Sequence, residues 1–369
     1  MARTGRTQDL SRIYLDDAGS APVLPEVLEA LRTVPPGNPS SPHAEGRAVR
    51  TVLDRARDLA AAAIGVQRTE VVFTSSGTES VNLALFGTRG PLLTWAAEHQ
   101  SVLGAVRRMQ ALGRGVTVAE VDAAARVDVD AIKAGIAVVS VGLANNEIGT
   151  IQPVREVIAR AHDIGALVHV DACAGPRWID VPQGADLVSY SGHKLGAGRG
   201  GMLYVRDGVR LEPLLYGGPQ EWGKRAGFED VASALAMAVA LSVCARERHV
   251  RSSVAYSQSL ALMLVLRDLG GRTTGAEDRL PNVASCAFAG RRGEDMLLAL
   301  DLAGVAASSG SACASGSLDP SHVLLATGMS LEEALGSLRL STGYSTTAAE
   351  VVRAGEILYS VLSRRGVHA

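Results

Sequence analysis

The sequence predicts an α/β protein in which a mostly parallel, seven-stranded sheet forms a large domain and a smaller α+β domain follows. From residue 70 onward, short apolar runs alternate with helical patterns, as they do when strands are joined by helices that cover both faces of a sheet. Alanine, valine, leucine and glycine are frequent and aromatic residues make up only 4%, which suits packed helices and buried parallel strands. The length of 369 residues also exceeds the usual size of a single domain.

The elements of the large domain are expected in the following order. A short strand at residues 13–22 runs into a turn, a helix covers residues 25–32, and an amphipathic helix after the polar break at 37–43 ends near residue 64. The strands of the sheet are expected at residues 71–74, 92–96, 116–121, 136–143, 166–170, 187–190 and 202–205. Helices between them are expected at residues 79–86, 100–112 and 154–164. Ligands of such sheets bind at the carboxyl ends of the strands.

A second unit is expected after a long helical stretch over residues 231–269. Its elements are a strand at 283–289, a helix at 294–302, an irregular loop at 307–320, a strand at 338–341 and a final helix at 348–362. We therefore expect a large domain over residues 14–250 and a small domain over residues 251–369. Residues 1–13 are expected to pack on the small domain.

Composition excludes several classes of partner. A net charge of −2 gives no reason to expect nucleic acid or an anionic membrane as a direct partner. No apolar segment is long enough to span a bilayer, and no apolar stretch follows the charged N-terminus as a signal peptide would require. The four cysteines lack the spacing of metal ligands, so no metal site is expected. A reduced, cytoplasmic enzyme is the simplest interpretation.

Lys194 is the first candidate for a catalytic residue. The chain has only three lysines, Lys133, Lys194 and Lys224, and arginine supplies nearly all of the positive charge. Lysine can lose its proton and form a Schiff base, whereas a guanidinium stays charged. Lys194 lies among hydroxyls, a histidine and glycines directly after a predicted strand. These neighbours favour a catalytic role for Lys194. For the other two lysines a solvated position is the simpler interpretation.

Polar residues also follow four other predicted strands. Residues 75–79 form a small-residue turn that opens a helix and that could hold a phosphate, although an ordinary helix cap has the same pattern. His99 follows the next strand, and the adjacent Asn145 and Asn146 follow a third, where they could simply form a turn. Asp171 ends a fourth strand and needs a cationic or hydrogen-bonding partner. The protonated ring nitrogen of pyridoxal phosphate would serve Asp171, and these groups together predict a site for that cofactor.

Cys313 is predicted to be a reactive thiol. It lies in a loop rich in serine and glycine, which is too polar for a core, and an exposed thiol can ionise and attack sulfur. Free cysteines are more often small buried hydrophobic residues. We interpret Cys173, Cys244 and Cys286 in that way.

Ordered motifs along nearly the whole chain resemble those of cysteine desulfurases, pyridoxal-phosphate enzymes of the aminotransferase class V branch of the aspartate-aminotransferase superfamily. The matching segments are YLDDA at residues 14–18, GNPSSPH at 37–43, FTSSGTES at 73–80, NNEIG at 145–149, HVDA at 169–172, SGHK at 191–194, SSGSAC at 308–313 and RLS at 339–341. The chain is most similar to the iron–sulfur-assembly and nitrogen-fixation type. The resemblance implies the aspartate-aminotransferase-like fold.

The resemblance also implies a role for each matching residue. The cofactor would be bound by Gly77, Thr78, His99, Asn146, Asp171, Ser191, His193 and Lys194. Lys194 would bond to the cofactor aldehyde, and Lys194, His99 and Cys313 would be the catalytic residues. Arg339 would hold the substrate carboxylate, with Asn146 beside it.

The implied reaction converts L-cysteine to L-alanine and leaves a persulfide on Cys313. A homodimer and a protein that accepts the sulfur are implied as well. The alternatives are another lyase of the same class, acting on selenocysteine or cystine, an epimerase, or a sulfur-relay scaffold with weakened catalysis.

Three residues depart from the pattern of the family. Ala174 stands where a glutamine is usual, Phe228 where a threonine reaches the neighbouring subunit's cofactor phosphate, and Asp17 where an asparagine is usual. Because the first two remove hydrogen-bonding side chains, we expect looser binding of the cofactor than in relatives.

Overall fold

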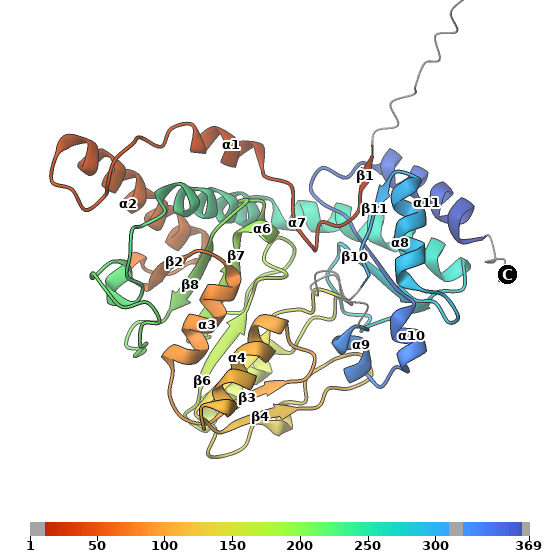
Figure 1. The fold of residues 1–369 in the computed structure, drawn as a ribbon, viewed down its shortest axis with the longest axis horizontal. Helices are drawn as coiled ribbons and strands as arrows, with labels where there is room; N and C mark the ends of the chain where they lie inside the picture. The colour runs from red at the N-terminus through yellow and green to blue at the C-terminus, as the bar shows by residue number, and fades with distance from the viewer. Residues whose placement is uncertain (1–11, 310–319, 364–369) are drawn as a thin grey trace, which may run out of the picture.

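Seven strands form one sheet in the larger part of the molecule (Figure 1). The computed structural model describes residues 12–309 and 320–363, and all seven strands that the sequence predicts are present. They are β2 (Val71–Thr74), β3 (Leu92–Trp95), β4 (Val116–Ala119), β5 (Val138–Gly142), β6 (Leu167–Asp171), β7 (Leu187–Ser191) and β8 (Gly201–Val205). Their order is β2-β8-β7-β6-β5-β3-β4; β8 runs antiparallel to β2 and β7, and the other neighbouring pairs are parallel. The predicted mostly parallel sheet is confirmed.

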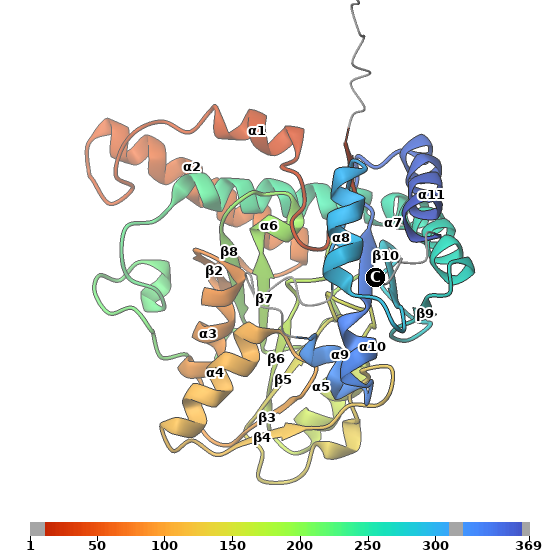
Figure 2. The ribbon, with the colours of Figure 1, turned by 45° about the vertical axis from the view of Figure 1, so that its right-hand side comes forward.

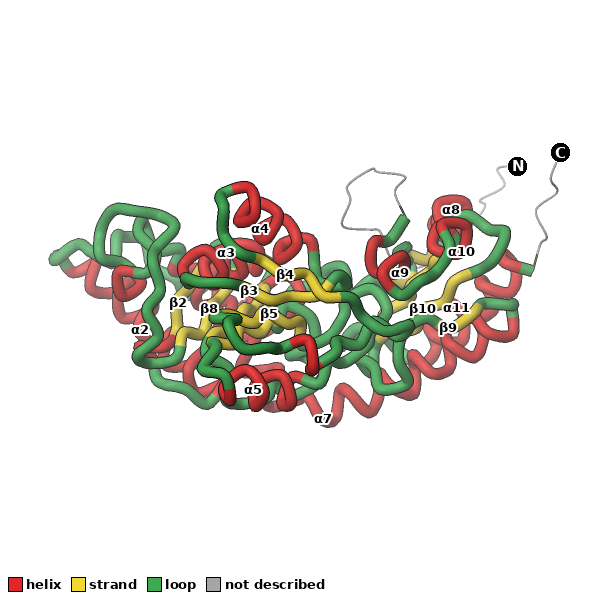
Figure 3. Tube along the Cα trace, turned by 90° about the horizontal axis from the view of Figure 1, so that it is seen from below, coloured by secondary structure: helices red, strands yellow, loops and turns green. Residues whose placement is uncertain are grey.

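Helices cover both faces of this sheet, and Figure 3 shows α3 and α4 on one side with α5 and α7 on the other. Their bounds, together with those of α2, are α2 (Ala44–Ile64), α3 (Gly77–Gly87), α4 (Gln100–Ala111), α5 (Val154–Asp163) and α7 (Val231–Asp268). Successive residues of a strand point to opposite faces. Leu92 and Val138 therefore pack with α3 and α4, whereas Leu93 and Val139 belong to the core that α2, α5 and α7 cover. Burial of both faces explains why these strands are apolar runs without alternation.

A small antiparallel sheet forms the second unit (Figure 2). Its strands and the neighbouring elements are β9 (Arg272–Thr273), β10 (Val283–Ala287), β12 (Ser337–Ser341), α8 (Gly293–Leu302), α9 (His322–Ala326), α10 (Leu331–Leu335) and α11 (Ala348–Leu362). Apolar residues of α8 and α11 share one core with β10 and β12. The N-terminal β1 (Ile13–Tyr14) pairs in parallel with β11 (Val305–Ala306), so the start of the described chain lies in this unit.

The helix α7 connects the two cores. Its 38 residues span about 57 Å. Met237 and Leu241 belong to the core of the large sheet, whereas Leu262 and Leu266 belong to the core of the small sheet. The expected domain limit at residue 250 falls inside this helix, which means that no flexible linker separates the two cores at that point. The division into residues 14–250 and 251–369 stays a prediction.

Two shorter helices complete the description. They are α1 (Pro25–Leu31) and α6 (Gly192–Leu195). Within residues 12–309 and 320–363, none of the helices is both long enough and apolar enough to cross a bilayer.

Candidate active site

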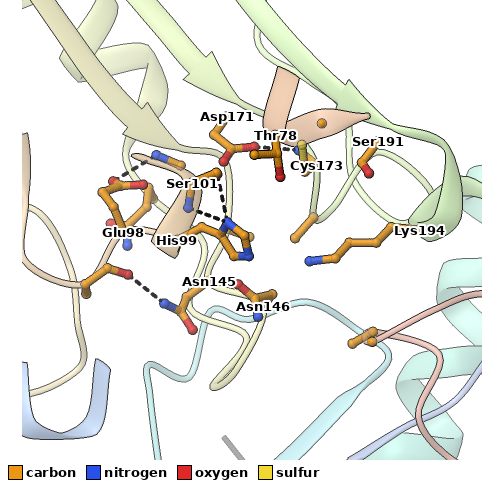
Figure 4. Close-up of a pocket in the computed structure, with 18 of the residues that line it drawn as sticks. Thr78, Glu98, His99, Ser101, Asn145, Asn146, Asp171, Cys173, Ser191 and Lys194 are labelled. Carbon is orange, nitrogen blue, oxygen red and sulfur yellow. Dashed lines mark hydrogen bonds between the residues drawn. The ribbon is translucent and has the colours of Figure 1, made fainter. Parts of the chain in front are cut away.

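A cavity of about 310 Å³ lies at the carboxyl ends of β2, β3, β5, β6 and β7 (Figure 4). The parallel strands bring their polar C-terminal residues to one edge of the sheet, and Arg339 of β12 reaches the same cavity from the small sheet. The predicted site residues that line it are Gly77, Thr78, His99, Asn146, Asp171, Ser191, His193, Lys194 and Arg339. The structure therefore brings together every predicted site residue that it describes.

Lys194 is positioned by the short helix α6, which begins directly where β7 ends. This tight turn needs glycine at position 192, because a Cβ atom there would collide with the carbonyl oxygen of Arg199. Lys194 is half-buried, and its side chain extends into the cavity toward His99 in Figure 4. An amine in this position can reach a group bound between the strand ends.

His99 caps the N-terminus of α4, and this contact orients its ring. Its Nδ1 atom accepts a hydrogen bond from the Ser101 backbone N–H at 3.1 Å and lies 2.8 Å from the Ser101 hydroxyl. Burial, together with the nearby positive charge of Lys194, lowers the pKa of His99. A neutral ring that accepts at Nδ1 carries its proton on Nε2, and Figure 4 shows this side of the ring facing the cavity. His99 is therefore a histidine with a defined donor edge at the site.

Asp171 ends β6 and is only 6% exposed. One of its carboxylate oxygens, Oδ1, accepts a hydrogen bond from the backbone N–H of Cys173 at 3.0 Å. The expectation of a hydrogen-bonding partner for this carboxylate is met within the strand end itself. Its carboxylate also lies where a cationic ligand group in the cavity could pair with it.

The interpretation of Cys173 as a core residue is wrong, because Cys173 is partly exposed and lines the cavity. Its Sγ atom would lie 2.5 Å from a Cβ atom at position 77, so the close approach of α3 to β6 requires Gly77. Burial and the neighbouring Asp171 raise the pKa of the Cys173 thiol well above its usual range. Cys244 and Cys286, by contrast, are buried as predicted.

The N-terminus of α3 forms the part of the cavity suited to an anion. Ser76 caps this helix by accepting a hydrogen bond from the Glu79 N–H at 3.2 Å, so the turn is an ordinary helix cap as well as a lining of the cavity. Thr78 lies in the first turn, and Ser191 faces Gly77, whose Cβ atom would lie 2.8 Å from that of Ser191. Ser191 Oγ in turn lies 2.9 Å from Nδ1 of His193. Helix N-termini with adjacent hydroxyl groups favour phosphate.

The two adjacent asparagines have different functions in the structure. Asn145 is a turn former: its Oδ1 accepts from the N–H groups of Glu147 and Ile148 at 2.9 and 3.1 Å, and its amide donates to the Ala97 carbonyl at 3.0 Å. These contacts fix the loop after β5 against the end of β3. Asn146 is thereby placed in the cavity lining, 9% exposed.

Arg339 already has two partners. Nη1 donates to the Asn146 carbonyl at 2.7 Å, and Nη2 donates to Oδ1 of Asp16, also at 2.7 Å. The contact with Asp16 could not be predicted from the sequence, since the two residues are 323 positions apart. The Arg339 side chain is 2% exposed, so its charge is compensated by this carboxylate.

Glu98 is a residue of the site for which the sequence suggested no function. It lines the cavity beside His99 at 6% exposure, and its Oε1 atom accepts from the Gly142 N–H at 2.9 Å. Burial raises the pKa of Glu98 to about 8, and the nearby charge of Asp171 adds to this shift. The signal that could have identified Glu98 is its position next to His99 at a strand end.

Cys313 lies outside the described residues. On its N-terminal side, Ser308 exchanges backbone hydrogen bonds with Arg339 of β12, at 3.1 and 2.7 Å. On its C-terminal side, the hydroxyl of Ser321 donates to the buried carboxylate of Glu147. The described residues on both sides of Cys313 in the sequence are thus attached to groups at or next to the cavity.

The chain matches the family model described as aminotransferase class-V over residues 13–353. The chain belongs to the aminotransferase class V family. The cysteine desulfurase IscS of Dictyoglomus turgidum is 37% identical over 373 residues, which cover 95% of each chain. A solved NifS-like protein is 29% identical and matches with a TM-score of 0.88 over 95% of this chain and 99% of its own. A solved structure described as SspA in complex with cysteine is 28% identical, with a TM-score of 0.78 over 91% of this chain and 100% of its own.

The three departures from the class V pattern have different surroundings. Ala174 lines the cavity without a polar side chain, and Phe228 is 63% exposed to solvent. Asp17 is 2% exposed and pairs with Arg177, whose Nη1 atom lies 2.9 Å from both carboxylate oxygens. This pair gives the aspartate at position 17 a structural explanation.

Proposed function

We propose that this chain is a pyridoxal-phosphate-dependent cysteine desulfurase that converts L-cysteine to L-alanine. The observation that carries the proposal is the convergence of Lys194, His99 and Asp171 on one cavity next to a helix N-terminus. Membership of the class V family and the resemblance to relatives named cysteine desulfurase support it.

The residues around the cavity fit pyridoxal phosphate. The first turn of α3, with Gly77 and Thr78, and the facing Ser191 and His193 would hold the phosphate, and the close approach that Gly77 permits forms this cradle. Asp171 would pair with the protonated ring nitrogen, since a nearly buried carboxylate suits a cationic partner. His99 and Asn146 would contact the ring, and Lys194 would bond to the aldehyde. Once bound, the cofactor would supply an electron sink for the charge that develops on the substrate.

The chain's own residues would then bind the substrate and move protons and sulfur. Arg339 would hold the substrate carboxylate, and Lys194 and His99 would carry the protons that leave Cα and return to carbon. The Cys313 thiolate would attack the substrate sulfur: an S–S bond forms, the C–S bond breaks, and the electron pair of that bond stays with the carbon that becomes the alanine methyl group. L-cysteine and one enzyme thiol thereby give L-alanine and one enzyme persulfide.

The assembly is proposed to be a homodimer that passes sulfur to an acceptor protein. Five large apolar side chains are exposed in the segment between β8 and α7: Leu214, Leu215, Tyr216, Trp222 and Phe228. Exposed apolar side chains concentrated in one segment favour a partner, and a second copy of the chain is the partner that the family resemblance suggests. A reduced, cytoplasmic setting is proposed because Cys173, Cys244 and Cys286 are unpaired thiols.

The proposal is tested by the products that the purified enzyme forms from L-cysteine in the presence of a reductant. We expect L-alanine and sulfide in equal amounts, and Lys194→Ala should lower the rate about 100-fold or more. Lys133→Ala is the matched control, because Lys133 is exposed and lies outside the cavity lining. A native rate in Lys194→Ala would contradict the proposal. Faster turnover of L-selenocysteine or L-cystine than of L-cysteine would favour the alternative lyases.

A further inference from the structure

The carboxylate of Asp16 lies at the edge of the cavity, and backbone contacts hold the residue in place. Asp16 forms a backbone bridge with Ser341 of β12, which places it beside the strand that carries Arg339. The carboxylate packs closely against Gly19, where a Cβ atom would lie 2.6 Å from Oδ2 of Asp16. The Asp16 side chain is 28% exposed, in contrast with 2% for Arg339. Asp16 is thus accessible from the cavity, whereas its arginine partner is enclosed.

The hydrogen bonds of Arg339 leave one edge of the guanidinium incompletely used. Nη1 is bound to the Asn146 carbonyl and Nη2 to Asp16, but the buried Nε atom has no hydrogen-bond partner among the described residues. A carboxylate binds arginine most favourably through two parallel N–H groups, and Nε with Nη2 forms such a pair. Because Nε is buried, an incoming carboxylate would form this pair only by displacing Asp16 from Nη2. Two carboxylates that share one guanidinium repel each other.

We propose that Asp16 is an internal carboxylate that occupies Arg339 when no substrate is bound and weakens the binding of the substrate carboxylate. This inference rests on the proposed function of Arg339 as the group that binds that carboxylate. A buried guanidinium must be paired, so Asp16 stabilises the ligand-free site. The same contact has to be displaced or shared when an amino acid binds. Asp16 therefore sets the affinity of the site for the α-carboxylate of an amino acid.

The experiment measures the dissociation constant of L-alanine for the cofactor-loaded enzyme by calorimetric titration. L-alanine has the α-carboxylate and amine of the substrate but no thiol, so binding is observed without sulfur transfer. Asp16→Asn should bind L-alanine about fivefold more tightly, because Arg339 then has no competing charge. Asp16→Ser, a second neutral replacement, should also bind L-alanine more tightly than the native enzyme. It keeps the test informative if Asp16→Asn folds poorly. Asp301→Asn, which removes an exposed carboxylate paired with Arg12, is the control and should not change the affinity.

Thermal unfolding gives an independent readout. The ligand-free Asp16→Asn enzyme should unfold at a lower temperature than the native enzyme, because Arg339 loses its partner. Saturating L-alanine should narrow that difference, since the ligand carboxylate replaces the lost one. Equal or weaker binding of L-alanine by both neutral variants would overturn the proposal, because Asp16 would then only orient Arg339.

A variant of Arg339 separates this proposal from the one on which it rests. Arg339→Gln should weaken L-alanine binding at least about tenfold. If it does so while the neutral Asp16 variants also bind weakly, only the role of Asp16 is overturned. If Arg339→Gln binds L-alanine as the native enzyme does, the substrate-binding role of Arg339 fails, and the role of Asp16 fails with it.

Discussion

At the scale of single residues, two carboxyl groups at the ends of β6 and β3, the strands on either side of β5, have different environments. Asp171 accepts a backbone N–H and lies where a cationic ligand group can pair with it. Glu98 accepts the N–H of Gly142, the residue that pairs with Asp171 across β5 and β6. Because both groups are buried, Glu98 holds its proton at neutral pH, with a pKa raised to about 8. A neutral Glu98 leaves Asp171 without a second negative charge beside it.

The shifted pKa of Glu98 predicts that folding stability depends on pH. The unfolded chain loses the Glu98 proton near pH 4.5, whereas the folded protein keeps it up to about pH 8. The group therefore contributes a stability that decreases as pH rises through this window. Between pH 5 and 8, the free energy of unfolding of the native protein should fall by on the order of a few kcal/mol relative to that of Glu98→Gln.

Urea unfolding of both proteins at pH 5, 6.5 and 8 checks this prediction. Glu156→Gln, at an exposed position on α5, is the control. Its free energy of unfolding should change with pH as that of the native protein does. If the free energies of unfolding of the native protein and Glu98→Gln differ by the same amount at all three pH values, Glu98 is already ionised in the folded protein.

The residues with chemistry at strand ends could be predicted from the sequence, because parallel strands bring their C-terminal residues to one edge. The placement of Asp16 and Cys173 could not. Asp16 comes from a segment 323 positions away from Arg339, so its contact depends on the packing of the small sheet. Cys173 comes two residues after the apolar strand β6, and the apolar pattern does not show that this loop lines the cavity.

At the scale of elements, the pair of Asp17 and Arg177 joins the N-terminal segment to the loop after β6. The Arg177 guanidinium also lies 4.1 Å from the ring centre of Tyr344, which follows β12. Three segments far apart in the sequence meet at this one guanidinium. The sequence shows Asp17 only as a departure from the family, because sequence spacing cannot reveal a partner 160 positions away.

This pair predicts a strong energetic coupling. Arg177→Met should lower the free energy of unfolding by about 3–5 kcal/mol, because it leaves Asp17 buried without a counter-charge. Adding Asp17→Asn should restore most of that loss, since the remaining side chain is neutral. Denaturant titration of the four proteins of the cycle measures the coupling. Glu333→Gln and Arg272→Met, at an exposed pair, form the control cycle, with an expected coupling below about 1 kcal/mol. Simple addition of the two effects at Asp17 and Arg177 would contradict the prediction.

At the scale of the whole molecule, all seven strands could be predicted from their apolar runs, but not their order or the antiparallel direction of β8. An apolar pattern indicates that a strand is buried. The order of the strands in the sheet depends instead on where each connecting helix returns the chain. The same limit applies to α7, whose two halves enter different cores although the helical pattern is continuous.

The exposed apolar segment between β8 and α7 predicts the oligomeric state. The native protein should sediment as a dimer, and a variant carrying Tyr216→Asp and Phe228→Asp should be largely monomeric, because two charges would then be buried in the interface. Leu302→Asp on α8 is the control, since Leu302 is 80% exposed on the small unit. Sedimentation equilibrium measures the three proteins. An unchanged dimer in the double variant would place the interface elsewhere.

The proposed reaction moves the sulfur of L-cysteine to Cys313, where it forms a persulfide. This transfer is tested by mass spectrometry of peptides from enzyme that has been treated with L-cysteine and then alkylated. Cys173 is the rival thiol, because it lines the cavity. We predict a reducible label of one extra sulfur on the Cys313 peptide, still present in Cys173→Ser and absent in Cys313→Ser. A label on the Cys173 peptide that persists in Cys313→Ser would show that Cys173, and not Cys313, receives the sulfur.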